Sequence, residues 1–160
     1  MDYGRVFQLI RELNRHEVEY IVVGGIALAL HGVVRATEDI DIFIKPTREN
    51  VESLKSSLKA LWNDNAVEDI SADDLLGDYP ALTYGPPDDS MSIDILTRLG
   101  EAFYYQDLES ETAEVQGLPV RIATVSTLIR MKKDTVRLQD KADVEALRRR
   151  FEKEGDESAS

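Results

Sequence analysis

Two short segments constrain this sequence more than any others: the glycine pair Gly24-Gly25, and an acidic segment over residues 38–44 that begins thirteen residues after it. Along a β-strand, side chains alternate between the two faces. Asp39 and Asp41 therefore project to one face, while the isoleucines between and beyond them face the core. Two neighbouring carboxylates repel each other unless a cation lies between them. The pattern predicts a site for a divalent cation, with magnesium as the first candidate.

The glycine pair ends an apolar run over residues 20–23, which reads as a short buried strand. Glycine permits a sharp turn and a close approach of the backbone to a ligand. The helix expected over residues 26–31 would present free N–H groups at its N-terminus, where phosphate binds well. Glycine pairs also end many strands without any further role. Only the position of Gly24 and Gly25 ahead of the acidic strand supports the prediction of a phosphate site.

The same residues resemble the signature of the polymerase-beta-like nucleotidyltransferase superfamily. In that signature, a hydrophobic residue and Gly-Gly or Gly-Ser precede a short helix, and an Asp-hydrophobic-Asp strand follows. Residues 23–25 and 39–42 match it. Residues 31–32 (His-Gly) and 35–37 (Arg-Ala-Thr) narrow the resemblance to the branch that contains the abortive-infection toxins of type IV toxin–antitoxin pairs. Antibiotic-modifying nucleotidyltransferases are more distant matches.

The resemblance implies a nucleotide site made by Gly24, Gly25, Arg35 and Thr37. The glycines would hold phosphate through the backbone. Arg35 would contact phosphate or form a structural ion pair with the acidic cluster, and the sequence leaves both alternatives open.

A third carboxylate is expected at Asp94. In the segment Ile93-Asp94-Ile95, an acid flanked by buried isoleucines must point to the polar face of its strand. In the superfamily such an acid lies on a neighbouring strand, so the resemblance implies that Asp39, Asp41 and Asp94 are catalytic and hold Mg²⁺ or Mn²⁺. The alternative is that Asp94 is one more exposed strand residue in an acid-rich protein.

A second motif of the branch resembles residues 128–144. It implies that Lys132 contacts the triphosphate and that Asp140 and Asp143 belong to the nucleotide site. A helix-starting aspartate is also an ordinary cap, which is the alternative for both acids. The sequence departs from the pattern at Gln139, where the branch has a lysine.

The remaining periodicity predicts an α+β fold, a small nucleotidyltransferase-like mixed sheet with helices packed on it. Helices are expected over residues 3–16, 48–62, 124–133 and 141–151, and strands over residues 20–23, 38–44, 81–84, 92–96 and 120–123. Residues 1–153 are expected to form one domain and residues 154–160 a disordered polar tail. Residues 63–90 show the weakest pattern.

Composition and charge indicate where the protein is located and which partners it can bind. The chain has no cysteine, no apolar run long enough to span a membrane and no recognisable signal peptide, so a cytoplasmic protein is expected. The net charge is −12, but residues 121–150 carry 9 basic and only 4 acidic side chains. The acidic surface disfavours a polyanionic partner, whereas this basic block allows one.

The resemblance implies a metal-dependent enzyme that moves NMP from an NTP to a hydroxyl acceptor. In the toxin-like branch the acceptor would be RNA, particularly tRNA, and a cognate antitoxin would be the partner. Two alternatives stay open. The acceptor is a protein or a small molecule, or the domain binds a nucleotide or a partner without catalysis.

Overall fold

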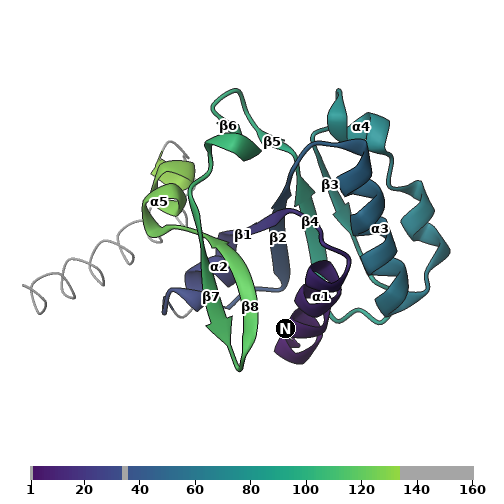
Figure 1. Cartoon of the computed structure of the whole chain (residues 1–160), viewed down its shortest axis with the longest axis horizontal. Helices are drawn as coiled ribbons and strands as arrows, with labels where there is room; N and C mark the ends of the chain where they lie inside the picture. Colours follow the sequence, from purple (N-terminus) through teal and green to yellow (C-terminus); the bar gives the residue numbers. More distant parts are fainter. Residues whose placement is uncertain (1, 34–35, 134–160) are drawn as a thin grey trace, which may run out of the picture.

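A computed structural model of the chain describes residues 2–33 and 36–133 (Figure 1). The described α-helices are α1 (Tyr3–Arg15), α2 (Gly24–Leu30), α3 (Arg48–Trp62), α4 (Ala72–Leu76) and α5 (Val125–Lys133). The strands are β1 (Tyr20–Val23), β2 (Asp39–Ile44), β3 (Ala81–Tyr84), β4 (Ser92–Leu96), β5 (Arg98–Leu99), β6 (Phe103–Tyr104), β7 (Ser110–Val115) and β8 (Leu118–Ala123). Short 3₁₀ turns lie at η1 (Asn65–Asp69) and η2 (Tyr105–Asp107). The predicted α+β fold is confirmed.

Six of the strands form one mixed sheet in the order β3-β4-β2-β1-β8-β7, while β5 and β6 form a separate hairpin. In the centre of the sheet, β2 runs antiparallel to β1 and parallel to β4. The strand β3 then pairs antiparallel with β4 at one edge. The two acid-bearing strands predicted from the sequence are therefore direct neighbours.

The long helices form where local signals and apolar spacing agree. The side chain of Asp2 caps α1, and the side chain of Thr47 caps α3, by accepting a backbone N–H of the first turn. Helix α3 ends at Asn63, which adopts the left-handed conformation that asparagine tolerates. One apolar face of each helix is fully buried in the core that the two helices share with the strands.

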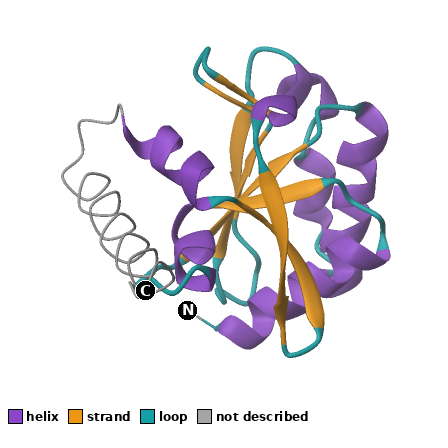
Figure 2. Cartoon of the chain, turned by 60° about the vertical axis from the view of Figure 1, so that its left-hand side comes forward, coloured by secondary structure: helices purple, strands orange, loops and turns teal. Residues whose placement is uncertain are grey.

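The helices lie on both sides of the sheet. Helices α1 and α3 pack together on one side, and α2 and α5 lie on the other (Figures 1 and 2). The described part of the chain contains no helix that is both long enough and apolar enough to cross a membrane.

Several elements differ from the expected ones. Helix α2 begins at Gly24 rather than at residue 26, so both glycines lie in its first turn. Strand β7 was not predicted. It forms a hairpin with β8 through Gln116 and Gly117, which both have positive φ angles (53° and 80°). The expected helix over residues 141–151 and the tail over residues 154–160 lie outside the described residues.

Candidate active site

The two central acids face each other across neighbouring strands. In the parallel pair β2 and β4, Asp41 is the register partner of Asp94. On the far side of β4, Asp94 is also the partner of Thr83 on β3, and on the far side of β2, Asp41 is the partner of Val23 on β1. Partners in register have their side chains on the same face of the sheet. Four strands therefore contribute one row of side chains, with the acid pair in its middle.

Burial and mutual repulsion change the ionisation of these acids. Burial raises the pKa of Asp41 to about 7, assisted by hydrogen bonding to the Asp94 carboxyl group and by the charges of Asp94 and Asp39, although Lys132 acts in the opposite direction. The pKa of Asp39 is also raised, by desolvation and by the charges of Asp94 and Glu38. The three predicted acids therefore interact electrostatically at one place.

Glycine is required at position 24 because the Asp41 carboxylate lies against it. A Cβ atom on Gly24 would lie 2.9 Å from the carboxyl carbon of Asp41 and would collide with one carboxylate oxygen. The residue also has a φ of 68°, which favours glycine. A Cβ atom on Gly25 would lie 3.1 Å from the Thr37 side chain, whose hydroxyl donates to the Asp39 carbonyl at 3.0 Å. The glycine turn and the start of the acidic strand are thus packed against each other.

The acid pair lies in a cleft of about 400 Å³. Val23 and Gly24 border it on one side, and Lys132 on α5 faces the acids closely enough to lower the pKa of Asp41. Much of the remaining wall is aliphatic, from β3, β4, β5 and α5: Leu82, Ile95, Leu96, Leu99, Leu128 and Met131. An anionic group in this cleft would meet one lysine and a partly apolar wall.

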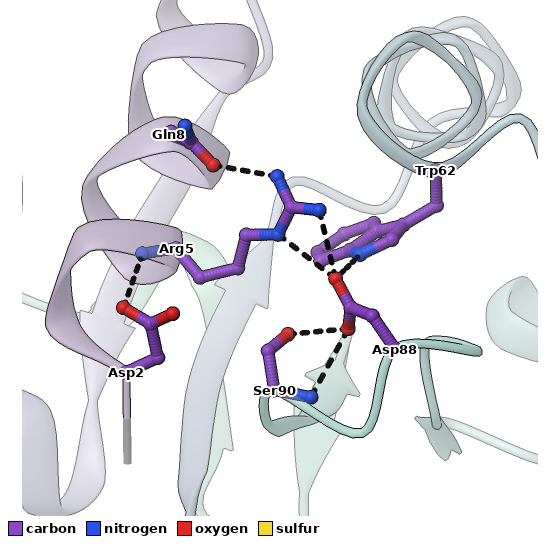
Figure 3. A network of polar contacts seen from close by, with 6 residues as sticks. All are labelled: Asp2, Arg5, Gln8, Trp62, Asp88 and Ser90. Atoms are coloured by element: carbon purple, nitrogen blue, oxygen red, sulfur yellow. Dashed lines mark hydrogen bonds and ion pairs between the residues drawn. The ribbon is translucent and has the colours of Figure 1, made fainter.

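Asp39 borders a second cleft, of about 310 Å³, together with Glu38, the loop over residues 85–91 and the first residue of β4. This loop is tied to the two long helices by the carboxylate of Asp88. The Asp88 carboxylate accepts from Arg5 Nε at 2.9 Å and from Trp62 Nε1 at 2.8 Å (Figure 3). The Arg5 guanidinium in turn lies over the Trp62 ring, 5.7 Å from its centroid. The network fixes the loop beside the acids.

The structure thus brings most of the predicted residues together. Four of them line one cleft: Gly24, Asp41, Asp94 and Lys132. Asp39 lies two residues before Asp41 on β2, and Gly25 lies against the Thr37 side chain. Arg35, Asp140 and Asp143 lie outside the described residues.

One polar residue of this cleft was not predicted. Thr83 Oγ1 donates a hydrogen bond to Asp94 Oδ1 at 2.5 Å. Threonine is common in β-strands, so nothing in the sequence around Thr83 indicates this contact.

The acid pair has the donor chemistry of a magnesium site. In the part of the chain that is described, no three His, Cys, Asp or Glu side chains are grouped closely enough to enclose a metal ion. Magnesium, however, is usually held by one or two carboxylates together with water and substrate phosphates, rather than by a cage of protein ligands. Asp41 and Asp94 are register partners that interact strongly enough to raise the pKa of Asp41, which favours a shared proton or a bound cation between them. The pair fits a magnesium ion that a nucleotide helps to bind.

A comparison with protein-family models identifies the family of the chain. Residues 3–152 match the family model described as "Nucleotidyltransferase of unknown function (DUF6036)". No curated protein matches the sequence.

Three solved structures share the fold at low sequence identity. The crystal structure of ANT(2″)-Ia in complex with adenylyl-2″-tobramycin is 13% identical, with a TM-score of 0.55, and the match covers 92% of this chain and 88% of that one. The solution structure of the antibiotic-resistance factor ANT(2″)-Ia is 14% identical, with a TM-score of 0.57 and coverage of 94% and 86%. A candidate nucleotidyltransferase from Thermotoga maritima is 16% identical, with a TM-score of 0.51 and coverage of 95% and 94%.

Proposed function

The chain belongs to this family of nucleotidyltransferases of unknown function, and from that premise we propose that it transfers NMP from a magnesium-bound NTP to a hydroxyl group. The membership agrees with the superfamily expected from the sequence, the polymerase-beta-like nucleotidyltransferases. The toxin-like branch stays a prediction.

One observation carries the proposal: Asp41 and Asp94 are register partners in a cleft that also contains Gly24 and Lys132. A half-buried pair of carboxylates lowers the stability of the folded protein, because each negative charge disfavours the other and both are partly desolvated. A cation and an anionic ligand together would relieve that cost. Magnesium and the phosphates of a nucleotide are the pair of ligands that this arrangement fits.

Each residue of the site then has a proposed role. Asp41 and Asp94 are proposed to hold the cation. Asp39, the third ligand predicted from the sequence, borders the second cleft and is proposed to act on the site through its charge. When bound, magnesium would stabilise the charge that develops on the phosphates. The backbone N–H groups at Gly24 and Gly25 bind phosphate, and Lys132 neutralises the triphosphate.

The transfer itself exchanges one phosphorus–oxygen bond for another. The acceptor oxygen forms a bond to the α-phosphorus while the bond to pyrophosphate breaks, and Asp94 accepts the proton of the acceptor hydroxyl. The cleft positions both reactants, which supplies much of the catalysis in phosphoryl transfers.

The remaining predicted residues keep their proposed roles from the sequence motifs. Thr37 shapes the nucleotide site through its contact with Gly25. Arg35, Asp140 and Asp143 are proposed to complete the nucleotide site.

Three acceptor classes are considered, and particular observations favour two of them. The branch resemblance favours the 3′ end of a tRNA, which would make the protein a toxin with a cognate antitoxin. A small hydroxyl compound is favoured by a different observation: Glu38, Asp39 and Asp89 border the second cleft, and carboxylates repel a polyanion. ANT(2″)-Ia, which shares the fold, was solved with an adenylylated small molecule. A protein hydroxyl is the third acceptor to test, and we place the reaction in the cytoplasm.

The experiment supplies each of the four NTPs, labelled at the α-phosphorus, together with magnesium and one of three acceptor pools: total tRNA, a mixture of small hydroxyl compounds, or total cell protein. The proposal predicts that wild-type protein labels one acceptor pool and releases pyrophosphate, and that Asp41→Asn does neither. Loss of transfer with rising salt would indicate tRNA, because phosphate contacts weaken steeply with salt.

A non-catalytic nucleotide-binding domain is the rival. In that case the wild-type protein would bind magnesium–NTP and label none of the three acceptor pools. That result would overturn the proposal.

A further inference from the structure

The cleft contains a hydroxyl group that the proposed reaction does not use directly. Thr83 lies on the edge strand β3, and its register partner is Asp94 on β4. Its Oγ1 donates to Asp94 Oδ1 at 2.5 Å, which is a short hydrogen bond to a carboxyl oxygen. Thr83, Asp94 and Asp41 therefore form a continuous row of side chains across three strands.

Asp94 lies between two neighbours that act on it differently. The Asp41 carboxyl lies on one side of it and repels it whenever both groups are ionised. The Thr83 hydroxyl lies on the other side and attracts it. Without that hydroxyl, repulsion would favour side-chain rotamers of Asp94 that point away from Asp41.

We propose that Thr83 is a positioning residue, which holds Asp94 in the orientation that its role in the site requires. The inference rests on the proposed function of the acid pair. Threonine suits this task because its branched side chain is restricted at χ1, so that its hydroxyl direction is fixed by the strand. The hydrogen bond occupies Oδ1 of Asp94 and leaves Oδ2 available for a cation or for the acceptor proton.

The sequence offers a matched set of variants for the test. Thr83→Val keeps the shape and the strand preference of the residue and removes the hydroxyl, whereas Thr83→Ser restores the hydroxyl. Thr112→Val makes the same change on β7, at a residue that lines a different cleft. Asp94→Asn removes the charge that Thr83 is proposed to position.

Two readouts are measured on each full-length variant: Mn²⁺ binding, by electron paramagnetic resonance in the presence of a non-hydrolysable NTP analogue, and the kcat and KM of transfer. Thr83→Val should weaken Mn²⁺ binding by about 10- to 100-fold, the usual effect of removing a group that orients a metal ligand. It should lower kcat more than it raises KM for the NTP. Thr83→Ser should recover most of both, and Thr112→Val should match wild type.

The outcomes separate this inference from the function on which it rests. If Asp94→Asn abolishes Mn²⁺ binding while Thr83→Val matches wild type, the positioning role is wrong and the acid site stands. If Asp94→Asn itself binds Mn²⁺ and turns over as wild type does, the proposed function fails first. Equal losses in Thr83→Val and Thr83→Ser would also overturn the inference, because the hydroxyl would then not be the group that matters.

Discussion

At the scale of single residues, the site depends on how closely Gly24 and Asp41 approach each other. The sequence pattern suggested that the glycines make room for phosphate. In the structure, the first steric demand on Gly24 comes from the protein itself, because a side chain there would collide with the Asp41 carboxylate. The glycine turn and the acid pair are therefore one unit, and a change in either should disturb the other.

Gly24→Ala tests this unit, with Gly117→Ala as a matched control. Both glycines have positive φ angles (68° and 80°), but a Cβ atom on Gly117 would meet nothing within 4 Å. The left-handed conformation alone should cost Gly117→Ala about 1–2 kcal/mol in the free energy of unfolding. In Gly24→Ala, overpacking should lower the free energy of unfolding by a further ~1–3 kcal/mol. This variant should also lose nucleotide binding. Chemical denaturation and NTP titration check both. Equal stability and equal binding in the two variants would contradict the steric argument.

Asp41→Asn should reveal the cost of the buried charge. Because the pKa of Asp41 is raised to about 7 in the folded protein, from an ordinary value of 3.8, the folded state binds the proton more tightly than the unfolded state. Wild-type stability should therefore fall as the pH rises from about 4 to 7. The Asn variant lacks this loss, so its stability relative to wild type should increase over the same range. Urea denaturation in EDTA at pH 5 and pH 8 measures the difference, and an unchanged difference would contradict it.

At the scale of elements, helix α5 closes the cleft over the acids of β2 and β4. Thr124 caps this helix by accepting the N–H of Thr127, and α5 then carries Lys132 to the cleft. A second element, the loop over residues 85–91, is fixed beside Asp39 by the Asp88 network (Figure 3). Helix α5 affects the site through the charge of Lys132, whereas the loop affects it by forming the wall of the cleft beside Asp39.

Lys132→Ala should weaken magnesium–NTP binding by at least about tenfold, because a contact with a charged group contributes about 1.5–3 kcal/mol. Arg130→Ala is the control. It removes a positive charge from the same helix, but Arg130 lies over the Phe103 ring at 5.6 Å and does not line the cleft. Calorimetric titration distinguishes the two variants. Identical losses would mean that only the net charge of the helix matters.

Asp88→Asn should destabilise the fold in a pH-dependent way. Burial raises the pKa of Asp88, but hydrogen bonds from Ser90, Trp62 and Arg5 outweigh it and hold that pKa well below its usual range. The stabilisation is therefore fully present above the ordinary value of about 4 and is lost as the pH falls through the folded-state pKa.

Thermal unfolding between pH 6 and pH 2 should show the gap between wild type and Asp88→Asn becoming smaller on acidification. Asp89→Asn, in the same loop, should change stability by no more than about 0.5 kcal/mol. A gap for Asp88→Asn that stays constant with pH would contradict the ionic part of the network.

At the scale of the whole molecule, the sheet order determines which residues meet. The strands β1, β2 and β4 were predictable because buried apolar side chains alternate with acids or form short runs. Strand β7 was not, since Ser110–Val115 lies at an edge and is largely polar. The pairing of Thr83 with Asp94 depends on the register of β3, which follows the short elements η1 and α4, in a part of the sequence with weak periodicity. No local pattern could reveal that contact.

The most direct test of the account is a calorimetric titration of the full-length protein with a non-hydrolysable analogue of each NTP, in magnesium and in EDTA. The titration is repeated with Asp41→Asn and with Asp94→Asn. The account predicts that wild type binds at least one analogue only in magnesium, and that both variants lose this binding while they unfold at temperatures no lower than that of wild type. Binding of equal strength in EDTA, or magnesium-dependent binding that survives in both variants, would contradict the assignment of Asp41 and Asp94 as the centre of the site.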